Sequence, residues 1–350
     1  FISTKFDFRR GEQPVFNLKY SSQRNFAVRA IRELFGRDLA KITDTKVLHS
    51  GSGEIGVRPD VSVTKEGLIS VSVPTDQMSK MKPGLYSVEL VITEGGKTYT
   101  DTFDFQWGVL AINPDKTEYQ RSEPAFISLG ALTPNGNTLC DAILQLYIID
   151  PDGFIDSVPV YESGQCFGNN VIDVPDYSTS YTPEKVGVYE MYLERLDSNG
   201  EVIGHTTDTF EVVSQQVISI KRTGPTRIFP PSPYPMELTI SADESFTGVL
   251  TERVPRSFEV FDTDAQIIKK GDYYELRWDV SLLAGSTEVY TYNFDAPDLS
   301  PYLYELGPAE LVSDNSMDVS ASSTASTTPI TNKDFLEHRN WQIASDATGN

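Results

Sequence analysis

The segment Pro83-Gly-Leu-Tyr86, followed by Phe103-Asp-Phe-Gln-Trp107, decides the fold because the chain repeats it as Val186-Gly-Val-Tyr189 followed by Thr209-Phe-Glu-Val212. Both copies have the pattern of a β-strand pair, with aromatic or aliphatic side chains at alternate positions. The tyrosines of the two copies lie 103 residues apart. A repeat of about one hundred residues is the size of one β-sandwich, so the sequence predicts a tandem array of sandwiches.

A similar opening strand precedes each copy, Gly11-Glu-Gln-Pro14-Val-Phe16 in the first and Ser122-Glu-Pro124-Ala-Phe126 in the second. The closing hairpin of the first copy turns at Gly95-Gly96 and carries apolar side chains in phase on both strands, namely Tyr86, Val88, Leu90, Ile92, Tyr99, Phe103, Phe105 and Trp107. The intervening positions are mainly Ser, Glu and Thr. Each strand is therefore expected to have one buried and one solvated face.

We predict an all-β chain of three tandem sandwich domains at 1–108, 109–214 and 215–350. The composition agrees, since 17 Tyr and 18 Phe favour strands and 24 Gly and 21 Pro favour turns. The third domain is divergent and carries a Ser/Thr-rich loop at 313–333 that has little apolar surface to bury. The segment after it, Phe335 to Ala344, either returns as the last strand of this domain or begins another element.

One segment of the first domain departs from the alternation. Apolar side chains recur at three- and four-residue spacing over 26–42, at Val28, Ile31, Phe35, Leu39 and Ile42. This spacing predicts a short amphipathic helix inserted between strands. Such a helix either packs across its own sandwich or docks on a membrane or partner.

The charge of the chain is uneven. The net charge of −21 divides into +2 for 1–108, −13 for 109–214 and −10 for 215–350. An acidic surface of this strength repels nucleic acid, so we expect no nucleic-acid partner. No apolar run is long enough to cross a bilayer, and no charged-then-apolar leader follows Phe1. We therefore expect any export signal or anchor to lie outside this segment, which we take as a matured chain or part of a longer one.

A basic insertion at 19–46 is the exception to the acidic character. Its candidate self-association residues are Arg24, Arg29, Arg32, Arg37 and Lys41. A basic segment at one end and acidic domains at the other would attract copies head to tail, a homo-oligomeric contact that propagates into filaments or layers. The alternative is a solvated basic face on a nearly neutral domain.

Cys140 and Cys166 are the two cysteines of the chain, and both fall in the second predicted domain. Cys140 is in phase with the inward positions of the following strand, and Cys166 comes 26 residues later after a loop. We predict that they form a disulfide, which indicates an oxidising compartment. The alternative is a pair of buried free thiols in a cytosolic protein.

The residues give little sign of catalytic chemistry, so we predict a protein that is not an enzyme, with no cofactor and no metal site. Each predicted domain holds one histidine, His49, His205 and His338, which leaves no triad or zinc spacing. Three aspartates at and just after the turn that follows the expected strand Ala142 to Ile149, Asp150, Asp152 and Asp156, lack the bidentate Glu of a calcium loop. We interpret them as turn residues.

The stretch Trp107-Gly-Val-Leu-Ala-Ile-Asn-Pro-Asp-Lys-Thr-Glu-Tyr119, together with Ser122-Glu-Pro124-Ala-Phe126, resembles the opening of macroglobulin-type immunoglobulin-like domains. That family has a Lys-x-x-Tyr segment before a Pro-Gly-Glu turn, and Arg121-Ser122 replaces Pro-Gly here. Gly187-Val-Tyr189 resembles its Gly-x-Tyr strand. The resemblance implies tandem immunoglobulin-like β-sandwiches like those of large bacterial cell-surface proteins. Protease-trapping members carry a Cys-Gly-Glu-Gln thioester, whereas Gly11-Glu-Gln13 follows an arginine.

These observations predict an extracellular or cell-surface structural protein, a self-associating repeat unit of a surface layer or filament. The first alternative is an adhesin or other binding module, for which cell-surface glycans are candidate partners. Aromatic side chains that could line a sugar-binding surface are Tyr181, Tyr273 and Tyr304, although strand tyrosines more commonly pack within the sheet. The second alternative is a segment of a macroglobulin-like protease-trapping protein.

Overall fold

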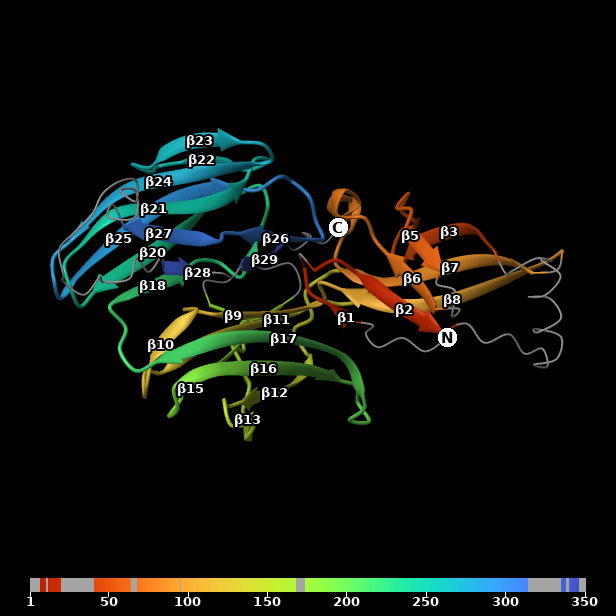
Figure 1. The fold of residues 1–350 in the computed structure, drawn as a ribbon, viewed down its shortest axis with the longest axis horizontal. Helices are drawn as coiled ribbons and strands as arrows, with labels where there is room; N and C mark the ends of the chain where they lie inside the picture. Colours follow the sequence, from red (N-terminus) through yellow and green to blue (C-terminus); the bar gives the residue numbers. More distant parts are fainter. Residues whose placement is uncertain are drawn as a thin grey trace, which may run out of the picture. The chain divides into compact units, whose positions relative to one another are not determined.

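The computed structural model describes residues 7–10, 12–19, 41–63, 68–94, 96–167, 174–313, 335–337 and 340–345. The chain is built from β-strands arranged in several separate sheets, which confirms an all-β fold with several β-sandwich domains (Figure 1). Within the described residues, one helical element is present, the 3₁₀ turn η1 at Thr75–Lys80. The chain forms two compact units, Phe1–Leu110 with Leu132–Asn137, and Ala111–Ala131 with Thr138–Asn350.

The first unit contains two sheets. One has the strand order β1 (Asp7–Phe8), β8 (Lys97–Trp107), β7 (Gly84–Glu94), β3 (Lys41–His49) and β4 (Gly53–Glu54), and the other has the order β2 (Val15–Lys19), β6 (Leu68–Ser72) and β5 (Asp60–Val63). Their facing side chains form one core that includes Phe16, Val71, Val88 and Phe105. The predicted alternation holds along β7 and the end of β8, with Tyr99 as the exception. Tyr99 is 45% exposed, although its cross-strand partner Ile92 is buried.

The helix expected over 26–42 falls largely outside the described residues. Its last two positions, Lys41 and Ile42, belong to β3, where Ile42 pairs with Ile92 of β7. This end of the segment is therefore extended rather than helical.

The second unit begins with a sandwich over 111–131 and 138–213, which we call the N-terminal sandwich. One sheet has the order β10 (Glu118–Gln120), β17 (Val202–Val213), β16 (Gly187–Leu196), β12 (Ile143–Ile149) and β13 (Ile155–Val158), and the other has β14 (Tyr161–Glu162), β15 (Tyr177–Tyr181), β11 (Ala125–Ala131) and β9 (Leu110–Pro114) (Figure 1). Tyr189 stacks on Phe210 between them, so the repeated Gly-Val-Tyr strand supplies core aromatics.

The remainder, 218–345, forms the C-terminal sandwich around one hydrophobic core. One sheet has the order β18 (Ile218–Thr223), β20 (Tyr234–Ala242), β25 (Ser286–Asp295) and β22 (Glu259–Phe261). A second has the order β23 (Gln266–Lys270), β24 (Tyr273–Leu282), β21 (Phe246–Pro255), β27 (Ala309–Ser313) and β28 (Phe335–Glu337). A third has the order β19 (Arg227–Ile228), β29 (Trp341–Ser345) and β26 (Tyr302–Leu306). The segment after the Ser/Thr-rich stretch thus returns to this sandwich as β28 and β29, the first of the two outcomes predicted for it.

Candidate functional site

The two sandwiches of the second unit meet along polar contacts that we call the inter-sandwich junction, made by Asn113, Asp115, Glu118, Phe167, Asp176, Gln216, Lys221, Arg222, Arg227 and Gln342. Asn113 lies on β9. Its Nδ2 donates to the carbonyl of Gln342 on β29 at 3.0 Å, and its Oδ1 accepts from the Gln342 backbone N–H at 3.1 Å. Both residues are buried. The side-chain amide thus satisfies the Gln342 peptide as a neighbouring strand would.

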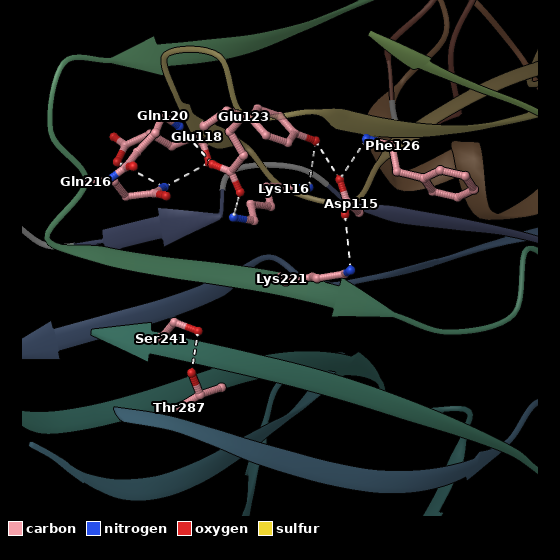
Figure 2. Close-up of polar contacts among 11 residues, drawn as sticks. Asp115, Lys116, Glu118, Gln120, Glu123, Phe126, Gln216, Lys221, Ser241 and Thr287 are labelled. Carbon is pink, nitrogen blue, oxygen red and sulfur yellow. Dashed lines mark hydrogen bonds and ion pairs between the residues drawn. The ribbon is translucent and has the colours of Figure 1, made fainter. Parts of the chain in front are cut away.

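Asp115 follows β9 and contacts β18 twice, and Figure 2 shows the first of these contacts, the ion pair with Lys221. Its carboxylate lies 3.4 Å from the ammonium of Lys221, and its carbonyl accepts from the backbone N–H of Arg222 at 3.0 Å. The same carboxylate accepts from the Tyr119 hydroxyl at 2.8 Å and from the Phe126 backbone N–H at 3.2 Å. Contacts within the N-terminal sandwich therefore hold the Asp115 carboxylate in the position from which it contacts Lys221 of the C-terminal sandwich.

The chain after Asp115 is held by a second set of contacts, which Figure 2 shows around β10. Lys116 forms an ion pair with Glu123, whose second oxygen accepts from the Gln120 backbone N–H at 2.9 Å. Gln216, which precedes β18, donates to the carbonyl of Glu118 at 2.8 Å. The start of the N-terminal sandwich and the connection to the next one are therefore joined directly.

This region contains the Lys-x-x-Tyr segment that carried the family resemblance. The backbone N–H of Lys116 donates to the Tyr119 hydroxyl at 3.0 Å, so the spacing serves a local turn. Ser122, at the position of the family's Gly, has φ of +65° and donates its hydroxyl to Glu184 at 3.0 Å. A left-handed backbone at this position explains why glycine suits it.

The predicted disulfide is present between Cys140 and Cys166. The adjacent carbonyl of Phe167 accepts from the guanidinium of Arg227 at 3.3 Å, and the same guanidinium lies 3.0 Å from Asp176. Arg227 is on β19 of the C-terminal sandwich, and both it and Asp176 are buried. The disulfide loop is therefore part of the inter-sandwich junction.

A buried charged cluster lies inside the C-terminal sandwich and includes the junction residue Arg222. The guanidinium of Arg222 donates to Glu252 at 2.8 Å and to the carbonyl of Leu306 at 3.0 Å. The Tyr292 hydroxyl donates to the other oxygen of Glu252 at 3.1 Å. Burial raises the pKa of Tyr292 well above its ordinary value, so this hydroxyl remains a donor. Arg222 thus ties the junction to the core through its backbone on one side and its side chain on the other.

The carboxylates of the turn at Asp150 and Asp152 form ion pairs with a lysine of the same sandwich. The ammonium of Lys185 lies 2.5 Å from Asp150 and 2.7 Å from Asp152, and its hydrogen bond lowers the pKa of Asp150. Asp156 instead accepts from the Tyr181 hydroxyl at 2.8 Å. Across the described part of the chain, no group of three or more His, Cys, Asp or Glu side chains could hold a metal ion.

The histidines have separate surroundings. His49 is buried in the first unit, where its Nδ1 accepts from the Gly51 backbone N–H at 3.2 Å and its Nε2 lies 3.3 Å from the Pro83 carbonyl. These contacts fit the neutral ring with its proton on Nε2, and burial lowers the pKa of His49. His205 lies on β17 of the second unit, and His338 lies outside the described residues.

The structure tests few of the other predicted site residues. Four of the candidate self-association residues lie outside the described residues, namely Arg24, Arg29, Arg32 and Arg37. Lys41 begins β3, and its side chain is not among those described. Of the aromatic residues considered for sugar binding, Tyr304 is buried and donates its hydroxyl to the Pro297 carbonyl at 2.7 Å, so it belongs to the core.

Sequence reasoning did not identify the buried charges, although a signal was present. Arg222 is in phase with the inward residues Ile218 and Ile220, and Glu252 is in phase with Leu250. Two opposite charges at inward positions of strands that belong to two sheets around one core predict a buried pair.

No helix among the described residues is both long and apolar enough to be a candidate membrane span.

No protein-family model and no curated protein matches the chain. Among solved structures, it is similar to a Corynebacterium diphtheriae protein described as membrane anchored, with 12% identity, a TM-score of 0.25 and coverage of 99% of this chain and 90% of that one. It is also similar to an alpha-2-macroglobulin variant from Salmonella (10% identity, TM-score 0.26, 98% of this chain) and to Escherichia coli alpha-2-macroglobulin activated by porcine elastase (11% identity, TM-score 0.26, 96% of this chain). The chain spans 22% and 31% of these two macroglobulins.

Proposed function

We propose that this chain is a segment of an exported, non-catalytic structural protein in which the two sandwiches of the second unit act as one rigid spacer. The observation that carries the proposal is the pair of reciprocal hydrogen bonds between Asn113 and Gln342, supported by the ion pair of Asp115 with Lys221. Contacts between residues so distant in sequence restrict a rotation that a short linker alone leaves free.

Small-angle X-ray scattering tests the rigid spacer. We expect the wild-type chain and an Asn113→Ala, Lys221→Ala double variant to differ, with a broader distribution of interatomic distances in the variant. Exposed Lys269 and Lys270 on β23 lie away from these contacts, so Lys269→Ala, Lys270→Ala is the matched control. A wild-type profile as broad as that of the double variant would exclude a rigid spacer.

The disulfide supports an extracellular or cell-surface location. Cys140 and Cys166 form the bridge, and a bridge persists where thiols are not kept reduced. Mass mapping of protein isolated from its native source under alkylating conditions tests this location. We expect the 140–166 bridge in the native material, whereas free, alkylated thiols would contradict export.

We further propose that copies associate head to tail into a surface layer or filament. The support is the sequence charge, since 1–108 is nearly neutral with a basic insertion and 109–350 carries −23. Sedimentation equilibrium of the wild-type chain should show association that weakens as salt rises. Substituting Arg24, Arg29, Arg32 and Arg37 with Glu should abolish it, whereas the same reversal at Lys269 and Lys270 should not. A wild-type chain that stays monomeric at low salt and high concentration contradicts the proposal.

A binding module is the second candidate. Three aromatic side chains of the N-terminal sandwich, Phe154, Tyr161 and Phe167, are each more than 60% exposed. Exposed aromatic rings provide surfaces for sugars and for protein partners. A glycan array probed with the wild-type chain and with the triple alanine variant tests this function. Saturable binding that the variant loses would favour an adhesin.

A further inference from the structure

The five-stranded sheet of the N-terminal sandwich, β10–β17–β16–β12–β13, has an apolar solvent face (Figure 1). Five of its branched aliphatic side chains are between 42% and 58% exposed, namely Ile143, Ile155, Val188, Val202 and Ile203. Among the residues whose exposure is described, no other sheet has more than two large exposed apolar side chains on its strands. A contiguous exposed apolar patch marks an interaction surface.

The strand register makes this patch continuous from β12 to β17. Val202 of β17 lies opposite Leu196 of β16, which in turn lies opposite Ile143 of β12. Further along the same strands, Tyr147 lies opposite Tyr192. The positions between them on β16 are buried. We call this side of the sheet the outer sheet face.

The outer sheet face is acidic as well as apolar. Its carboxylates belong to Glu190 and Glu194 of β16 and to Glu211 of β17, which alternate with buried residues of the same strands. Glu211 lies opposite Glu118 of β10, so two like charges are neighbours, an arrangement that costs stability. The five strands contain one Lys or Arg, Arg195, and it is buried. A cationic partner would therefore lower the repulsion on this face.

The outer sheet face does not take part in the inter-sandwich junction. The N-terminal sandwich contributes to the junction through Asn113 and Asp115, through Glu118 at the edge of the sheet, and through Phe167 and Asp176. None of the junction contacts described above uses β12, β16 or β17. The C-terminal sandwich therefore leaves this face open.

The sequence contains a segment whose charge and apolar character complement this face. Residues 20–40 lie outside the described residues, and their sequence alone is used here. They carry a net charge of +2, 4 minus 2, from Arg24, Arg29, Arg32 and Arg37 against Glu33 and Asp38. The same segment includes the apolar residues Val28, Ile31, Phe35 and Leu39. Its guanidinium groups suit carboxylates, and its apolar side chains suit the aliphatic patch.

The C-terminal sandwich is also acidic, but its strands offer a poorer match. Lys221 of β18, Arg277 of β24, and Lys269 and Lys270 of β23 stand at exposed or half-buried positions there. These cations would repel a basic segment. Charge complementarity therefore favours the outer sheet face.

We propose that the segment 20–40 of one copy docks on the outer sheet face of a second copy. This proposal rests on the proposed head-to-tail association and names the surface that accepts the basic segment. Because the segment and the face are different surfaces, each copy can use both at once. The contact then propagates from copy to copy instead of closing into a twofold dimer.

Two full-length variants separate the segment from the face. The segment variant carries glutamate in place of Arg24, Arg29, Arg32 and Arg37. The face variant carries Glu190→Lys, Glu194→Lys and Glu211→Lys. Sedimentation velocity at low salt is measured for the wild-type chain, for each variant alone and for an equimolar mixture of the two.

We expect the wild-type chain to form oligomers and each variant alone to remain monomeric. The mixture should form 1:1 dimers that grow no further, because the intact segment of the face variant docks on the intact face of the segment variant and no second contact is left. These dimers should dissociate as salt rises.

A matched control removes the same number of negative charges elsewhere. Asp243, Glu244 and Asp279 are exposed carboxylates of the C-terminal sandwich, and their replacement by lysine should leave association at the wild-type level. Circular dichroism and thermal unfolding check that each variant is folded. If the face variant does not fold, Glu190→Gln, Glu194→Gln and Glu211→Gln take its place, because glutamine keeps the size of each side chain.

The outcomes separate this proposal from the proposed function. A folded face variant that associates as the wild-type chain does would overturn docking on this face and leave head-to-tail association intact. A matched control that becomes monomeric as well would show that total charge, rather than this face, governs association. A mixture without dimers would also overturn the docking. A wild-type chain that remains monomeric would contradict the proposed self-association itself, and the docking with it.

Discussion

Asn113 and Gln342 are separated by 229 residues, yet each satisfies the hydrogen-bonding groups of the other in the interior of the second unit. The side-chain amide of Asn113 donates to the Gln342 carbonyl and accepts from the Gln342 N–H, so it makes the two hydrogen bonds that a neighbouring strand would make. It lies between β9, near the start of the N-terminal sandwich, and β29, at the end of the C-terminal one (Figure 1). The first and last strands of the second unit are thereby joined.

Replacing Asn113 should destabilise the second unit. Asn113→Ala leaves the buried N–H and C=O of Gln342 without their partner, which costs about 2–4 kcal/mol at about 1–2 kcal/mol for each group. Urea unfolding measures the loss. Asn199→Ala is the matched control, because Asn199 lies in an exposed turn and its loss should cost less than about 0.5 kcal/mol. Equal midpoints for the two variants would contradict the structural role of Asn113.

The buried pair of Arg222 and Glu252 should respond non-additively to substitution. Arg222→Met leaves an uncompensated buried carboxylate and should cost about 3–5 kcal/mol. Adding Glu252→Leu removes that charge and should recover much of the loss, although the Tyr292 hydroxyl then lacks its acceptor. A double-mutant cycle from urea unfolding measures the coupling. Losses that simply add would show that the two charges do not interact.

Replacing Ser122 with glycine should stabilise the second unit, whereas replacing it with alanine should not. Its φ of +65° is strained for an L-residue, so Ser122→Gly should stabilise the second unit by about 0.5–1 kcal/mol. Both variants lose the exposed hydrogen bond to Glu184, but Ser122→Ala also keeps the strain, so it should be neutral or destabilising. Thermal unfolding of both variants gives the comparison, and a lower melting temperature for the glycine variant would contradict the argument.

His49 should make the first unit sensitive to mild acid. Burial lowers the pKa of His49 below its ordinary 6.5, and the positive charge of Lys82 acts in the same direction. The unfolded chain therefore takes up a proton that the folded chain does not, so stability is complete above about pH 6.5 and falls as the pH drops towards the lowered pKa. Melting temperatures between pH 7.5 and 5.5 should decline in the wild-type chain and decline less in His49→Gln.

Much of the architecture was predictable because a sandwich strand exposes one face and buries the other. The alternation in Tyr86–Ile92 and the repeat at Tyr189 identified core strands, and the phase of Cys140 identified the inward side of β12. Tyr99 departed from the pattern, because alternation predicts which face of a strand a side chain lies on and not how far it is covered. The charges of Arg222 and Glu252 were readable from phase as well, since each occupies an inward position.

The sequence alone determined the strand periodicity, the hundred-residue repeat and the single possible disulfide, because each depends on local spacing or on composition. Only the tertiary structure decided that Asn113 meets Gln342 and that Arg227 meets the disulfide loop. Those contacts depend on how the two sandwiches pack, and residues 229 and 60 positions apart carry no local pattern that predicts their contact. The place of Trp341–Ser345 in the middle of a sheet was likewise decided by long-range pairing with β19 and β26.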